Sequence, residues 1–128
     1  MSDIQNLASI KLMVDDFYTR VRRDGLLGPV FNNVIKDDWQ PHLDKMYAFW
    51  NAALFGVAGF KGNPFARHAP LLINAGHFER WLELFNQTID SHFAGPMAND
   101  AKNRAGLMAA MFQSKLANLK GGPERVIV

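Results

Sequence analysis

The chain has 128 residues, of which 48% are hydrophobic and 20% are charged, with a formal net charge of +2. This composition excludes a disordered chain, and so small a charge gives no indication of nucleic-acid binding. The absence of cysteine excludes disulfides, thiolate metal sites and a cysteine nucleophile. We therefore expect one globular domain over residues 1–119, followed by a flexible tail over residues 120–128.

Neither the start of the chain nor any later stretch predicts contact with a membrane. No apolar run approaches the roughly 20 residues that a bilayer requires. The opening sequence, MSDIQNLASI, lacks the basic region followed by an apolar region that marks a signal peptide. We expect a cytoplasmic protein.

The first helix is expected to begin near the N-terminus and to end at about Arg23. Ser2 and Gln5 have the spacing of a capping box. Apolar residues then follow at helical spacing: Ile10, Val14, Phe17, Tyr18 and Val21. This pattern places Tyr18 on the buried side of the helix.

A corner is expected after this helix. Asp24-Gly25 would end the helix, and Leu27-Gly28-Pro29 predicts a turn because proline disfavours helical geometry in the residue before it. Three cations near the helix end favour its dipole and are interpreted as a solvated face: Arg20, Arg22 and Arg23.

The next helix is expected to be capped by Asp37 or Asp38, with Trp39 in its first turn. Its apolar stripe contains His42, Met46, Phe49 and Ala53, and it is widened by Leu43, Trp50 and Leu54. His42 is therefore expected on a buried aromatic stripe. Because histidine is intermediate in burial, a partly exposed side chain near the helix start remains an equal alternative.

A loop is expected from Phe55 to Pro64, since glycines recur at positions 56, 59 and 62. A short helical piece over residues 65–69 follows and carries His68, and Pro70 limits its continuation. His68 stands among apolar neighbours. A histidine in such a context is usually a hydrogen-bonded core or surface residue, but imidazole is also a common metal ligand.

Two amphipathic helices are expected to complete the chain. The first carries apolar residues at helical spacing: Phe78, Trp81, Leu82, Phe85, Ile89 and Phe93. The second follows Gly95-Pro96 and presents a stripe from Met97 to Leu119. Because no segment reads as a convincing strand, the sequence predicts an all-α domain.

Several common chemistries have no support in the residues. The histidines His42, His68, His77 and His92 include no zinc-binding pair on one helical face, and no serine lies in a nucleophile elbow. Glu79 and Glu83 lie one turn apart beside Arg80, which is typical of a solvated face. The many aromatic residues suit a large planar cofactor better, although core packing alone would also use them.

An ordered set of motifs resembles the truncated haemoglobins, and within them group III. The set is Phe17-Tyr18, Leu27-Gly28-Pro29-Val30-Phe31, Trp39 with His42, Phe49-Trp50, His68, His77-Phe78 and Trp81-Leu82, and it extends over roughly residues 4–119. The resemblance implies a two-over-two helical sandwich that holds haem b, iron protoporphyrin IX. Phe60 is a mild departure, because the family pattern has tyrosine there.

The resemblance also implies the roles of particular residues. His68 is similar to the proximal histidine that binds the haem iron. Tyr18, His42 and Trp81 match the three polar distal positions that stabilise an iron ligand. Four aromatic residues resemble those that pack around the porphyrin: Phe31, Phe49, Trp50 and Phe78. His77 also looks family-like, but it receives no role.

The function implied is reversible binding of dioxygen with high affinity and slow release, and nitric oxide, carbon monoxide or cyanide are further expected ligands. Slow release suits chemistry on the ligand, such as nitric oxide dioxygenase or peroxidase-like activity, which would need an external and unidentified reductase. His42 is alternatively a swinging gate, and His42 or Tyr18 could ligate ferric iron. The rival hypotheses are a haem-based ligand sensor and a haem-free helical interaction domain.

Overall fold

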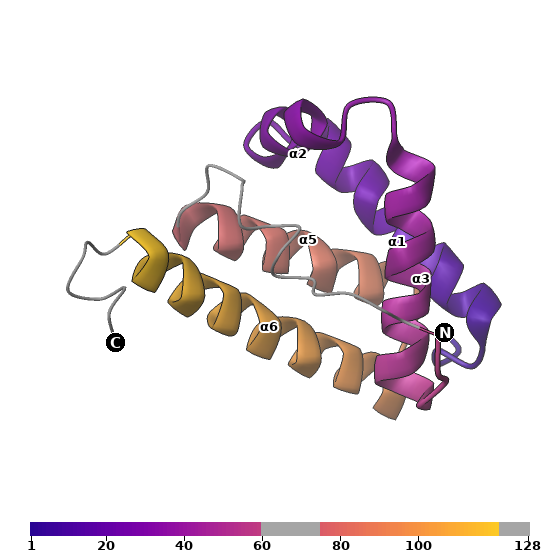
Figure 1. The fold of residues 1–128 in the computed structure, drawn as a ribbon. Coiled ribbons are helices and arrows are strands. Elements are labelled where there is room, and N and C mark those ends of the chain that lie inside the picture. The colour runs from indigo at the N-terminus through magenta and orange to yellow at the C-terminus, as the bar shows by residue number, and fades with distance from the viewer. Residues whose placement is uncertain (60–74, 121–128) are drawn as a thin grey trace.

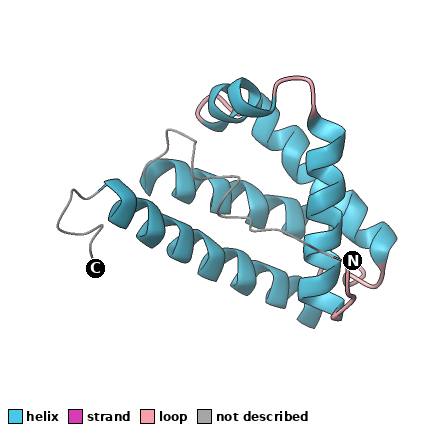
Figure 2. Ribbon diagram, viewed as in Figure 1, coloured by secondary structure: helices cyan, strands magenta, loops and turns pink. Residues whose placement is uncertain are grey.

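The computed structural model describes residues 1–59 and 75–120, and within this part every regular element is a helix (Figure 2). The helices are α1 (Leu7–Arg23), α2 (Leu27–Ile35), α3 (Trp39–Phe55), α5 (Ala75–His92) and α6 (Pro96–Lys120). The predicted all-α class is confirmed. Phe60, His68 and the expected short helix over residues 65–69 lie outside the described residues, as do residues 121–128 of the expected tail.

The helices form two pairs that pack on each other (Figure 1). In one pair α1 crosses α3, and in the other α5 and α6 lie side by side. Contacts between α1 and α5, and between α3 and α6, join the pairs, while α2 packs against α1 and α5. This arrangement is the expected two-over-two sandwich. Its centre contains the most deeply buried side chains, among them Ile10, Met13, Val21, Phe85 and Ile89.

The start of α1 differs from the predicted capping box. Its N-cap residue is Asn6, whose side-chain oxygen accepts a hydrogen bond from the backbone N–H of Ser9 at 3.0 Å. Ser2 instead accepts a backbone hydrogen bond from Ala94 at 3.1 Å. The prediction for Ser2 was wrong because asparagine caps equally well and stands closer to the apolar stripe.

The residues before α1 help to form another helix terminus. The carboxylate of Asp3 accepts hydrogen bonds from the backbone N–H groups of Met97 and Ala98, at 2.9 and 2.8 Å. These two groups belong to the first turn of α6, where helix N–H groups have no partner within the helix. Gly95 precedes that turn with a φ of 143°. Asp3 therefore ties the beginning of the chain to its last helix.

The corner after α1 is shorter than predicted, since Leu27, Gly28 and Pro29 are already helical. Proline is tolerated in the first turn because its missing N–H would have had no partner there. The turn lies at Asp24 instead. Its carboxylate accepts hydrogen bonds from the backbone N–H groups of Leu26 and Leu27, at 3.1 and 3.0 Å.

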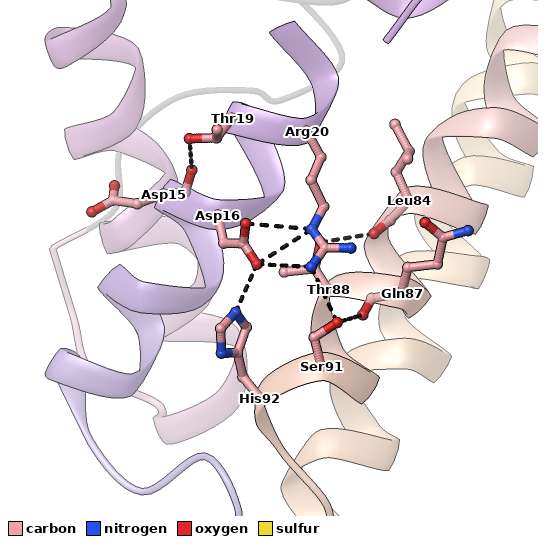
Figure 3. A network of polar contacts seen from close by, with 9 residues as sticks. All are labelled: Asp15, Asp16, Thr19, Arg20, Leu84, Gln87, Thr88, Ser91 and His92. Atoms are coloured by element: carbon pink, nitrogen blue, oxygen red, sulfur yellow. Dashed lines mark hydrogen bonds and ion pairs between the residues drawn. The ribbon is translucent and has the colours of Figure 1, made fainter. Parts of the chain in front are cut away.

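A polar network joins α1 to α5 (Figure 3). The carboxylate of Asp16 contacts the Arg20 guanidinium at 3.2 Å and the Nε2 atom of His92 at 2.7 Å. The Arg20 guanidinium also donates to the Ser91 hydroxyl at 3.1 Å. Partial burial opposes ionisation of Asp16, but these hydrogen bonds outweigh it and lower its pKa. Arg20 thus connects two helices rather than forming part of a solvated face.

A second ion pair links α5 to the corner between α1 and α2. The guanidinium of Arg80 donates to the buried carboxylate of Asp24 at 2.7 Å and also contacts Glu83. The interpretation of Arg80 as part of a solvated face was therefore incomplete.

In the ranges 1–59 and 75–120, no helix is long and apolar enough to cross a membrane.

Candidate functional site

The first group of candidate residues gathers where α1 faces α3. Tyr18 is buried on α1, and its ring lies edge-on to the His42 ring of α3, with centroids 4.9 Å apart. Trp39 lies one helical turn before His42, and its ring centroid is 5.9 Å from both of these rings. Phe31 of α2 lies 6.5 Å from Tyr18. These four residues are called the Tyr18 cluster. The alternative of a partly exposed His42 is excluded, because its side chain is only 4% exposed.

The second group lies on α5 and is joined to the first by Phe17. The Phe17 ring is 4.9 Å from Tyr18 and 5.4 Å from Trp81. Trp81 in turn stacks on Phe85 at 5.8 Å with an interplanar angle of 11°. The three proposed distal residues, Tyr18, His42 and Trp81, are therefore members of one continuous aromatic network.

An apolar cleft opens beside Trp81, between α2, α5 and α6. Its lining residues are Leu27, Phe31, His77, Phe78, Trp81, Ala109 and Phe112. All but His77 are apolar, so the walls suit a hydrophobic planar group. The walls stand close together and leave about 10 Å³, which is room for about one water molecule.

Two of the predicted porphyrin contacts lie elsewhere in the described residues. Trp50 is buried in the core, where it stacks on Phe85 at 5.1 Å, and Phe49 packs beside Trp50 at 5.3 Å. Neither residue is among those that line the cleft. Phe31, Phe78 and Trp81 do meet at the cleft, and His77 joins them there.

Burial sets the protonation state of Tyr18. Removing its phenol from water raises its pKa above the usual value near 10, because the charged phenolate is disfavoured. The hydroxyl therefore stays protonated at physiological pH and retains its hydrogen for donation.

Among residues 1–59 and 75–120, no group of three or more His, Asp or Glu side chains could hold a metal ion.

Two indole N–H groups at the site are buried without a hydrogen-bond partner in the described structure, those of Trp39 and Trp81. Indole can only donate, so each group needs an acceptor. Leaving a buried donor unsatisfied costs on the order of 1–3 kcal/mol. Such atoms are expected where a ligand completes the site.

Sequence reasoning missed several of these residues. Trp39 was quoted within the family resemblance but received no role, although its position three residues before His42 places it on the same helical face. Leu27 was assigned to the turn and to the resemblance, Phe112 only to the apolar stripe of the last helix, and Ala109 to no feature, yet all three line the cleft. For Ala109 and Phe112 the available signal was their helical spacing, which shows burial but does not identify the neighbour.

Together, a two-over-two helical sandwich and an aromatic cleft beside buried donors define a globin-like protein. The comparison with family models agrees, because the bacterial-like globin model matches residues 3–117. The chain therefore belongs to the bacterial-like globin family. A curated relative, the group 3 truncated hemoglobin ctb of Campylobacter jejuni, is 34% identical over 120 residues, which are 91% of this chain and 94% of the relative.

A solved structure gives the same result for the fold. The crystal structure of the group III truncated hemoglobin from Campylobacter jejuni superposes with a TM-score of 0.82 at 34% identity, covering 91% of this chain and 95% of that chain. The resemblance to group III truncated haemoglobins is thus confirmed. Membership of a globin family implies a haem at which small gaseous molecules bind.

The residues of the cleft fit such a group in their chemistry. A porphyrin needs apolar walls, which Leu27, Phe31, Phe78 and Phe112 supply. A polar ligand beside it needs a donor, and Trp81 lines the cleft with an unpartnered buried N–H.

Proposed function

We propose that this globin holds haem b in the cleft between α2, α5 and α6 and binds dioxygen reversibly, with high affinity and slow release. The observation that carries this proposal is the buried and unpartnered indole N–H of Trp81 in the wall of an apolar cleft. Nitric oxide, carbon monoxide and cyanide are further proposed ligands. When bound, the haem supplies an iron with a position open to such a ligand.

The chain is proposed to hold the haem through one imidazole and several apolar walls. His68, which lies outside the described residues, is the proposed iron ligand. Phe31 and Phe78 supply the walls seen at the cleft. Phe49 and Trp50 remain proposed contacts, and their positions next to the core aromatic residues imply that they support the site rather than border the cleft.

Three side chains are proposed to hold the diatomic ligand: the Tyr18 hydroxyl, the His42 imidazole and the Trp81 indole. All three are buried, so their hydrogen bonds form in a medium with little competition from water. Each bond to a polarised acceptor is worth about 1–3 kcal/mol. Since about 1.4 kcal/mol corresponds to a tenfold change in an equilibrium constant, one such bond slows release by about tenfold or more.

Slow release also supports a proposed detoxifying role toward nitric oxide or peroxide. A ligand held for a long time can meet a second reactant before it leaves. The buried donors would then orient the ligand and exclude bulk water from it. Repeated turnover would require electrons from an external reductase, and consumption of nitric oxide by the reduced protein measures whether the activity exists.

Absorption spectra of the purified protein with haem test the proposal. We expect a Soret band in the ferric and ferrous forms and a shift of that band with carbon monoxide. His68→Ala should abolish stable haem binding or change the ferrous spectrum. His92→Gln is the matched control, because His92 contacts Asp16 and lies away from the cleft. An unchanged spectrum in His68→Ala would remove this residue as the ligand, and the absence of any haem uptake would favour a haem-free interaction domain.

A further inference from the structure

A basic groove lies on the other side of α2, where the ends of α1 and α2 meet. Its lining residues are Thr19, Arg22, Arg23, Asn32, Lys36 and Asp37, and its volume is about 700 Å³. The lining thus contains three cations and one carboxylate, although the formal charge of the whole chain is only +2. Positive charge is concentrated here and is not spread evenly over the surface.

The three cations of this groove form no ion pair with an acid in the described part of the chain. Other cations do: Arg20, Arg80, Lys102 and Arg104 each contact a carboxylate. Arg22, Arg23 and Lys36 instead face the same hollow. These exposed cations repel one another only weakly in water, and a polyvalent anion placed between them would be attracted by all three.

The backbone of Lys36 has an unusual conformation at the end of α2. Its φ is 57° with ψ of −120°, and it is the non-glycine residue with positive φ in the described ranges. Glycine adopts such a conformation without strain, whereas a residue with a Cβ atom does not. Lys36 is the C-cap residue of α2, so this conformation ends the helix at the rim of the groove.

We propose that this groove binds a small polyvalent phosphate anion. Two guanidinium groups can each present paired N–H donors to phosphate oxygens, and a lysine adds a compact charge. The groove is larger than a single phosphate needs, which favours an anion carrying more than one phosphoryl group. The carboxylate of Asp37 opposes binding and keeps the affinity moderate.

Binding in the groove can be followed through the fluorescence of Trp39, which Arg22 contacts. Its guanidinium carbon lies 4.6 Å from the centroid of the Trp39 ring, a cation–π contact. An anion that engages Arg22 weakens this contact and changes the fluorescence of Trp39. The heat of binding measured by calorimetry does not depend on haem, so the inference can be tested separately from the proposed function.

The experiment is a titration of the full-length protein with inorganic pyrophosphate at low ionic strength, followed by calorimetry and by tryptophan fluorescence. Low salt is needed because surface electrostatics are screened over about 10 Å at 0.1 M. We expect saturable binding with one site. Arg23→Ala and Lys36→Gly should each weaken it about tenfold, as expected for the loss of one charge-assisted contact. Asp37→Asn should tighten binding, and Trp39→Phe should remove most of the fluorescence change.

Two controls separate a built site from general attraction and from unfolding. Lys45→Ala removes an exposed cation that does not line the groove and should leave the dissociation constant unchanged. Lys36→Gly relieves a strained backbone, so its melting temperature should stay the same or rise while binding weakens about tenfold. Absence of saturable binding would overturn the proposal, as would equal losses in Lys45→Ala and Arg23→Ala. Tighter binding of poly-glutamate than of pyrophosphate would also overturn it, in favour of an acidic protein partner.

Discussion

The imidazole of His42 lies edge-on to the phenol ring of Tyr18, with ring centroids 4.9 Å apart and planes at 85°. The two residues come from different helices, since Tyr18 belongs to α1 and His42 to α3. Each ring therefore restricts the other. Two potential donors are thus held side by side, which is the arrangement required for stabilising a small polar ligand without reorganisation.

Tyr18→Phe should raise the rate of oxygen dissociation about tenfold or more, because it removes one buried hydroxyl donor and keeps the ring. Stopped-flow replacement of oxygen by carbon monoxide measures this rate. The other tyrosine provides a matched control. Tyr47 donates its hydroxyl to Asp15 on the surface side of α1 and α3, so Tyr47→Phe should leave the rate unchanged. Equal rates in Tyr18→Phe and the wild type would remove Tyr18 from the donor set.

Trp81→Phe should change the stability of the haem-free protein only slightly. The substitution loses apolar contact with Phe17 and Phe85, but it also removes a buried N–H whose lack of a partner costs on the order of 1–3 kcal/mol. Urea denaturation measures the balance, and we expect a difference below about 1 kcal/mol. In the haem-bound protein, the same variant should release oxygen faster. A strongly destabilised haem-free variant would mean that the lost apolar contacts outweigh the removal of the buried N–H.

Gly95→Ala should destabilise the fold by about 1–3 kcal/mol, since Gly95 has a φ of 143° that other residues rarely adopt. A Cβ atom there would also lie 2.6 Å from the Asp3 carboxyl carbon and would disturb the cap of α6. Gly106→Ala within α6 is the opposite control. Nothing lies within 4 Å of its added Cβ, so thermal denaturation should show a gain of about 0.4–1 kcal/mol. A loss of stability in Gly106→Ala equal to that in Gly95→Ala would contradict this account.

The long helices could be predicted from the sequence because each carries an apolar stripe at helical spacing. The predicted end of α1 at Arg23 is confirmed, and α6 was expected after Gly95-Pro96 and begins at Pro96 itself. The helix α2 was missed because Gly28 and Pro29 read as a turn. The turn interpretation overlooked that Asp24 can accept hydrogen bonds from the backbone N–H groups of Leu26 and Leu27, a local contact at the start of this helix.

The site could be predicted less completely, because it depends on contacts between distant segments. Tyr18, His42 and Trp81 came from the ordered resemblance, and the structure connects all three through ring contacts. Helical spacing predicts which side of a helix is buried. It does not reveal that Phe112 of α6 would lie across a cleft from Phe31 of α2.

Stability in acid should depend on Asp24. Burial opposes ionisation of this carboxyl, but backbone N–H groups and the Arg80 guanidinium outweigh burial and hold its pKa below the ordinary value of 3.8. A group with a lowered pKa in the folded state stabilises the protein above its unfolded pKa and loses that contribution as the pH falls through its folded pKa. The stabilisation that the ionised Asp24 carboxylate contributes therefore begins to be lost near pH 4 and is lost further as the pH falls.

Asp24→Asn removes the charge and keeps one acceptor oxygen. At pH 7 the variant should melt several degrees below the wild type. This difference in melting temperature should shrink as the pH falls below about 4, because Asp24 of the wild type then becomes protonated. Other carboxylates titrate alike in both proteins, so the difference between the two curves isolates Asp24. Glu83→Gln is the control, because Glu83 contacts the same Arg80 but is exposed, and its effect should be much smaller. A difference in melting temperature that stays constant from pH 7 to pH 2 would show that the charge of Asp24 does not stabilise the corner between α1 and α2.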